Sequence, residues 1–198
     1  MRWLVWTAAT FPIAVLSHEL AHYAAYRAFD FEGASLHYGS ASYAVSDAFW
    51  ERVREGDLVA ASLLVPPWQA GFAAGAGLIA TYATIALCVV MARLRPHPFW
   101  VGLGLIAPLR FLSSVLVVVG TLLGRHHGSG SDEEHVASTF PLPELALHAL
   151  GIAVMVAAWA ILLRVPSRHV PRGRLAVLAG IAVGGILYIG VLGPWLLP

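Results

Sequence analysis

Five apolar stretches, separated by polar breaks, run along the 198 residues of this chain. A helix needs about 20 residues to cross the ~30 Å hydrocarbon core of a bilayer. Lipid cannot satisfy free backbone groups, so helices are the expected spanning form. We therefore predict an all-α integral membrane protein with about five transmembrane helices. The predicted spans lie near residues 3–28, 70–93, 99–123, 143–164 and 174–196.

Two of the connections are longer and more polar than the others, and the first covers residues 29–69. Alternating residues around Gly39 and Ser40 predict a small β-hairpin after the first span. Ser46 or Asp47 is a candidate cap for a short amphipathic helix that follows. An irregular interfacial loop fits the same residues. If the hairpin forms, its edge strand can hold an extended peptide by the backbone.

Composition supports the membrane class and excludes several others. The chain is 59% hydrophobic and only 12% charged, with a mean hydropathy of +0.75, whereas soluble domains carry about 25% charged residues. A net charge of +1 gives no reason to expect a nucleic-acid partner. Cys88 is the only cysteine, which excludes an internal disulfide framework and a cysteine-rich metal site. The expected environment is a lipid bilayer, in a prokaryotic cell membrane.

The arginines predict an orientation in the membrane, because positive residues accumulate on the cytoplasmic side. Four arginines flank the spans on one side, at Arg27, Arg52, Arg54 and Arg125. Seven flank them on the other side, at Arg2, Arg93, Arg95, Arg164, Arg168, Arg172 and Arg174. We therefore predict a cytoplasmic N-terminus, with the C-terminus and both long connections outside.

The first span contains the motif HELAH, which places three ionisable side chains where lipid is expected. Such groups are costly inside a membrane and are candidates for function. His18 and His22 are four residues apart, so a helix points both at one ion, with Glu19 beside them. Chance matches to this pattern number about 0.01 in a chain of this composition. At 1.5 Å per residue, His18 lies ~22 Å along the span, so the site falls nearer the outer face.

Two imidazoles, a third protein ligand and a water suit Zn²⁺. Zinc lowers the pKa of a bound water, and Glu19 can move the water's proton to a leaving amine. The motif therefore predicts a zinc-dependent peptidase in which Glu19 is the catalytic acid and base.

The third ligand is expected in the second long connection, which covers residues 124–143. It lies on the same predicted side as the motif, and its sequence GSGSDEEHVAS has four candidate donors in succession. Ser131 or Asp132 can cap a helix there. Asp132 is the favoured ligand. The alternatives are Glu133, Glu134 and His135.

These segments resemble the site-2 protease family of intramembrane zinc metalloproteases, in a small bacterial form. HELAHYAAYRAFDFEGASLHYGSASY resembles the family's motif helix and the glycine-containing β-rich loop after it. FAAGAGLIATYATIAL resembles the small-residue helix that packs on the motif helix, and GSDEEHVASTFPLP the segment that supplies an aspartate ligand. The resemblance implies one membrane-embedded domain over 1–198, with a catalytic core of about 1–145 and two further helices in 143–196. It implies His18, His22 and Asp132 as zinc ligands.

The chain departs from this family in two respects, because the family's usual Asp-Gly ligand pair is not visible and there is no asparagine anywhere. The family uses an asparagine in a helix motif, where it can polarise the scissile carbonyl. Arg110, His148, His37 or a backbone N–H would have to take that role here. Arg110 also fits a structural ion pair, and His148 fits either a partner of a metal ligand or an ordinary interfacial histidine.

Three functions follow from these patterns. The first is an intramembrane zinc peptidase that cleaves a membrane protein or peptide. The alternative is a non-catalytic membrane protein with a structural or regulatory metal site. The third is an electron carrier that uses the histidines for haem or acts with quinone, although this leaves Glu19 without a role.

Overall fold

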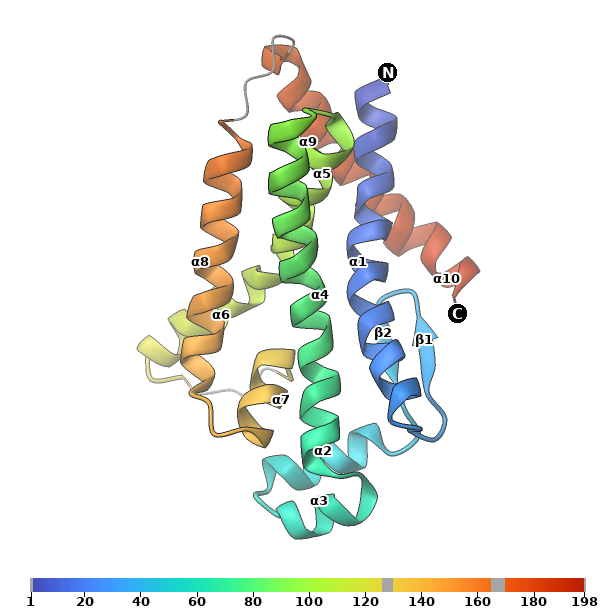
Figure 1. Ribbon diagram of the computed structural model, residues 1–198, viewed down its shortest axis with the longest axis vertical. Coiled ribbons are helices and arrows are strands. Elements are labelled where there is room, and N and C mark those ends of the chain that lie inside the picture. The colour runs from blue at the N-terminus through green and yellow to red at the C-terminus, as the bar shows by residue number, and fades with distance from the viewer. Residues whose placement is uncertain (1, 126–129, 165–169, 198) are drawn as a thin grey trace.

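The computed structural model describes residues 2–125, 130–164 and 170–197, which are mostly helical (Figure 1). This confirms the predominantly helical prediction and the small β-hairpin within it. The elements in chain order are α1 (Arg2–Ala28), β1 (Ser35–His37), β2 (Ser40–Ser42), α2 (Ser46–Arg54), α3 (Leu58–Leu64), α4 (Pro67–Leu94), α5 (Pro98–Ile106), η1 (Ala107–Phe111), α6 (Leu112–Leu122), α7 (Asp132–Thr139), α8 (Glu144–Leu162), α9 (Val170–Leu187), η2 (Tyr188–Leu192) and α10 (Gly193–Leu196).

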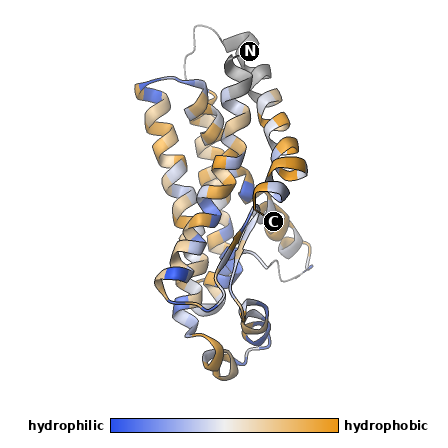
Figure 2. Ribbon diagram, turned by 90° about the vertical axis from the view of Figure 1, so that its right-hand side faces the viewer, coloured by the Kyte–Doolittle hydropathy of each residue, from blue (hydrophilic) through white to orange (hydrophobic). Residues whose placement is uncertain are grey.

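Four helical stretches in the described part of the chain are long and apolar enough to cross a membrane. They are Pro67–Leu94, Pro98–Leu122, Glu144–Leu162 and Ala179–Leu196. In the most apolar stretch of each, only 28% to 44% is buried inside the protein, so many apolar side chains remain at least partly exposed. Apolar helices with exposed apolar surface are typical of membrane proteins, and Figure 2 shows such residues along the long helices.

The first predicted span forms a single helix, α1, but it is not one of these four. Its 27 residues are enough for about 40 Å of helix. Its interior carries polar side chains, including Thr7, Thr10 and the HELAH motif. α1 packs against α4, α5 and α9, so the first predicted span is a long helix within the bundle.

The third predicted span is interrupted by η1, a 3₁₀ segment between α5 and α6. Pro108 lies in this segment and has no N–H to continue the helical hydrogen bonds. The carbonyl of Leu105, just before the break, accepts a hydrogen bond of 3.0 Å from Trp159 on α8. The break places Arg110 on a tight turn in the interior of the bundle.

The elements from both long connections gather at one end of the bundle, around the ends of α1 and α4 (Figure 1). The hairpin pairs Leu36 with Ala41, which leaves Tyr38 and Gly39 as its turn. α2 begins at Ser46 without a side-chain cap, so the predicted cap at Ser46 or Asp47 is wrong. α2 contacts α7, which brings the two connections together.

Candidate metal centre

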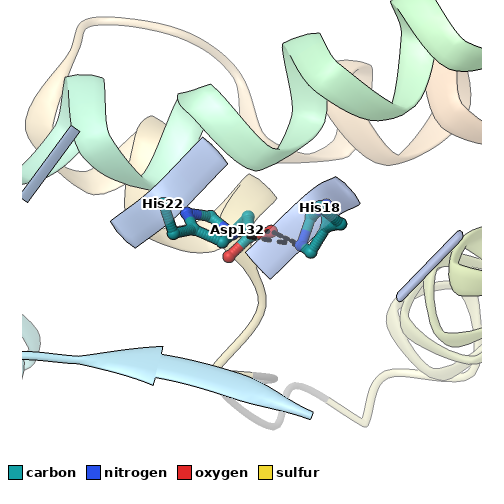
Figure 3. Close-up of side chains that lie close together, drawn as sticks. All are labelled: His18, His22 and Asp132. Carbon is teal, nitrogen blue, oxygen red and sulfur yellow. Dashed lines mark hydrogen bonds and ion pairs between the residues drawn. The ribbon is translucent and has the colours of Figure 1, made fainter. Parts of the chain in front are cut away.

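Three side chains from two distant segments converge on one point (Figure 3). His18 and His22 come from adjacent turns of α1, and Asp132 comes from the first turn of α7. The two Nε2 atoms are 3.0 Å apart, and Asp132 Oδ2 lies 3.1 Å from that of His18 and 3.3 Å from that of His22. Ligands of a tetrahedral zinc at 2.0–2.1 Å are about 3.3 Å from one another. The donors therefore have nearly the spacing of one face of a tetrahedron, which fits a metal with its fourth position open.

The other ring nitrogens of the two histidines bind the backbone of α4. His18 Nδ1 lies 2.8 Å from the carbonyl oxygen of Gly77 and 3.0 Å from Thr81 Oγ1. His22 Nδ1 lies 2.8 Å from the carbonyl oxygen of Ala73. A carbonyl can only accept, so each Nδ1 donates its proton and each Nε2 keeps its lone pair. Metal-binding histidines typically have such an arrangement.

The close approach of α1 to α4 requires glycine at position 77. A Cβ on Gly77 would overlap the rings of both His18 and His22. Gly75 lies two residues earlier on a different side of α4. A Cβ there would only touch Val136 at 3.5 Å. The small-residue segment of α4 thus lets two imidazoles lie directly on a helix backbone.

Interactions within and around α7 direct Asp132 toward the two histidines, while the neighbouring candidate ligands contact other groups. The Ser131 side chain caps α7 by accepting from the N–H of Glu134. The Glu134 carboxylate accepts from the N–H of Gly130 at 2.7 Å. His135 stacks on Trp50 at 3.8 Å between ring centroids. Glu133 points away from the histidines into the protein, so the structure brings Asp132, of the four candidates, to the histidine pair.

Arg110 forms hydrogen bonds with two of the atoms that would bind a metal. Its Nη1 is 2.8 Å from Asp132 Oδ2 and 2.8 Å from His18 Nε2. Burial of the Asp132 carboxyl raises its pKa, but interactions with His18, His22 and the positive charge of Arg110 outweigh burial and hold the pKa well below its usual range. Asp132 is therefore a carboxylate at neutral pH, as a metal ligand must be.

A chain of buried polar groups continues from Arg110 to α8. Arg110 Nη2 donates to Glu133 at 3.3 Å, and Glu133 accepts from Ser114 at 3.5 Å. Ser114 Oγ lies 2.9 Å from His148 Nδ1, and His148 Nε2 lies 3.4 Å from Glu144. Glu133 is 1% exposed and His148 is fully buried. A buried carboxylate is costly unless it is paired, so this network couples the positions of η1, α6, α7 and α8.

Two further predicted residues lie at different distances from the centre. Glu19 is half-buried beside His18, and its carboxylate makes no hydrogen bond to the residues that the structure describes. His37 ends β1, where its Nε2 lies 3.2 Å from Ser35 Oγ. His37 is not among the residues that line the cavities around the three donors.

Two cavities meet at the candidate centre, and both are lined by His18, Glu19, Gly130 and Asp132. The first, of about 450 Å³, extends toward the hairpin and α2. Its further lining is mostly polar and includes Ser40, Ser46, Asp47, Arg54 and His135. The second, of about 540 Å³, extends toward η1. Its further lining is mostly apolar and includes Phe11, Ala14, Val15, Ile106 and Leu109. Glu19 thus lies between a polar and an apolar compartment.

Several residues around the centre were not recognised in the sequence. Glu133 was considered only as a ligand, although it pairs with Arg110. Ala73, Gly77 and Thr81 belong to the small-residue segment that the sequence predicts only as a packing helix. Their spacing of four residues on α4 matches the spacing of the two histidines on α1, and that match is a usable sequence signal.

No protein-family profile, curated protein or solved structure matches this chain.

Replacing Gly77 by Ala should weaken metal binding, because the added methyl group forces α1 and α4 apart at the two histidines. Overpacking of this kind costs about 1–3 kcal/mol, so we expect a loss of Zn²⁺ affinity of roughly five- to 150-fold, measured by competition with a chromophoric chelator. Gly75→Ala is the matched control and should keep wild-type affinity. Wild-type affinity in Gly77→Ala would contradict the observed helix contact.

Replacing Glu133 by Gln should also weaken metal binding while leaving all three donors in place. One of the two carboxylate partners of Arg110 loses its charge, so the guanidinium binds Asp132 more strongly and competes better with a metal. Loss of such outer partners costs roughly 10–100-fold in metal affinity, which the same chelator competition with Zn²⁺ measures. Glu51→Gln, on the exposed surface of α2, is the control. If the two variants bind Zn²⁺ equally, the buried network does not support the centre.

Proposed function

We propose that this protein is an intramembrane zinc-dependent peptidase. The observation that carries the proposal is the convergence of His18, His22 and Asp132 at tetrahedral spacing, with the free carboxylate of Glu19 beside them. This combination of two imidazoles, one carboxylate ligand and one unliganded carboxylate suits hydrolysis. It also favours the resemblance to site-2 proteases, which we propose as the protein's family.

Each residue has a defined role in this proposal. His18, His22 and Asp132 would hold the zinc, which would act as a Lewis acid and lower the pKa of a water molecule. Glu19 accepts a proton from the attacking water and later donates it to the leaving amine. The carbonyls of Ala73 and Gly77 keep both imidazoles in the tautomer that leaves Nε2 available.

Arg110 is the proposed replacement for the asparagine that the chain lacks. Its guanidinium lies within hydrogen-bond distance of His18 and Asp132. A positive group held at this position by Glu133 stabilises negative charge that develops on a peptide carbonyl oxygen. Arg110 is therefore expected to act on the transition state more than on substrate binding.

The two cavities support a peptide substrate that has both apolar and polar segments. The apolar cavity suits a segment that arrives from the membrane, and the polar cavity suits water and a hydrophilic segment. A membrane protein or membrane-associated peptide meets both requirements.

One observation favours a second function, that of a non-catalytic protein. Arg110 already neutralises Asp132 and contacts His18. In this alternative the cluster is an internal ion pair, or a structural metal site, that ties α1, η1 and α7 together. It leaves the accessible carboxylate of Glu19 without a role, and for that reason we place it second.

The deciding experiment compares Glu19→Gln with His18→Ala. The probe is a fluorescence-quenched synthetic peptide with one apolar segment of about 20 residues and polar flanks, reconstituted with the purified protein in lipid. Glu19→Gln should keep wild-type zinc content and lose at least 10²-fold in kcat, since it lacks the acid and base. His18→Ala should lose zinc and cleavage together.

Glu32→Gln is the control for the loss of a carboxylate, because Glu32 is exposed outside the centre. Zinc well below one equivalent in the wild-type protein would support the non-catalytic alternative. Undiminished cleavage by Glu19→Gln would reject the proposed mechanism.

A further inference from the structure

The β-hairpin forms one wall of the polar cavity. Ser40 and Ala41 of β2 line it together with Glu19 and His22 of α1. A strand of the hairpin runs past the three donors in Figure 3. β2 is hydrogen-bonded to β1 alone in the two-stranded sheet. The position of this hairpin relative to α1 therefore determines how wide the cavity is beside Glu19.

The base of the hairpin is attached to α1 by aromatic rings. Tyr43 packs against Tyr26 at 5.0 Å and against Phe31 at 4.7 Å between ring centroids. All three rings are buried. Tyr26 lies one turn after His22 and stacks on it at 6.3 Å. One end of the hairpin is thus fixed to the helix that carries the motif.

The turn of the hairpin is attached to the C-terminal segment instead. The Tyr188 hydroxyl donates to the Tyr38 carbonyl at 2.6 Å. The Tyr38 N–H donates to the Leu197 carbonyl at 3.2 Å. A Cβ on Gly193 would overlap the ring of Tyr38, so the two segments are in close contact. Both backbone groups of a turn residue are satisfied by a segment about 150 positions away in sequence.

The C-terminal segment has a firm position because α9 crosses α1 directly. Pro12 has no N–H, so the carbonyl of Ala8 has no helical partner on α1. Gly184 packs on this carbonyl, where a Cβ would overlap it. The next contact along the same crossing is Phe11 with Tyr188, at 6.3 Å between ring centroids. Tyr188 begins η2, a π-helical turn of a kind often found at functional sites.

We propose that Tyr188 is a positioning residue, which holds the hairpin turn against the C-terminal helix and so sets the width of the polar cavity for substrate. The inference rests on the proposed peptidase function, since the cavity is taken to bind a peptide. Tyr188 acts through Tyr38 and β2, not on the metal ligands. Its loss should therefore impair peptide binding more than the chemical step.

The test is Tyr188→Phe, which removes the hydroxyl and keeps the buried ring. Hydrogen exchange, read by mass spectrometry, should be roughly two- to tenfold faster for amides of residues 35–43, as expected for the loss of one hydrogen bond. The KM for the same quenched peptide should rise by a similar factor, while kcat and zinc content stay within twofold. Tyr23→Phe removes a hydroxyl from α1 that has no hydrogen bond among the described residues and is the control.

Gly193→Ala is a second variant, whose added Cβ would overlap both the Tyr38 ring and the Tyr188 backbone carbonyl, so it disturbs the same contact without changing any tyrosine. It should reproduce the faster exchange and the higher KM. If the wild type cleaves the peptide but neither variant changes exchange in 35–43, the inference is wrong. Faster exchange with an unchanged KM also overturns it, because the hairpin then does not shape the substrate cavity. Absence of cleavage by the wild type would instead reject the peptidase function.

Discussion

The contact between α1 and the backbone of α4 is the constraint on which the rest of this structure depends. Two imidazoles can lie inside an apolar bundle only because the carbonyls of Ala73 and Gly77 accept their Nδ1 protons. The absence of a side chain at Gly77 makes that approach sterically allowed. Once the rings are held, their Nε2 atoms face α7, and Asp132 completes the cluster. Packing, hydrogen bonding and candidate chemistry therefore depend on the same few atoms.

Much of this arrangement could be predicted from the sequence, because it depends on local periodicity. The spacing of His18 and His22 places them on one helix face, and the alternation around Gly39 indicates a hairpin. Ser131 was recognisable as a helix cap, and with it the start of α7. The sequence favours Asp132 as the third ligand but does not exclude its neighbours. Which side of the short helix α7 faces α1 is decided by tertiary packing, which the sequence pattern does not show.

The features that could not be predicted are those in which one residue has partners from several elements. In the sequence, Arg110 is a single charge within an apolar span. In the structure, its guanidinium forms hydrogen bonds with His18, Asp132 and Glu133. The packing of α1 is another case. α1 spreads its polar groups along one helix, and only the neighbouring helices show how a bundle accommodates them. At the 3₁₀ break, the carbonyl of Leu105 accepts a hydrogen bond from Trp159, which lies on another helix.

The separation of the donors along the chain also has a consequence for biosynthesis. His18 and His22 are made first, and α4 supplies their carbonyl partners about 50 residues later. Asp132 follows only after two-thirds of the chain has been synthesised. Until then, α1 can pair with α4 through its histidines but lacks its carboxylate ligand. The complete candidate donor set can therefore form only after α7 has been synthesised.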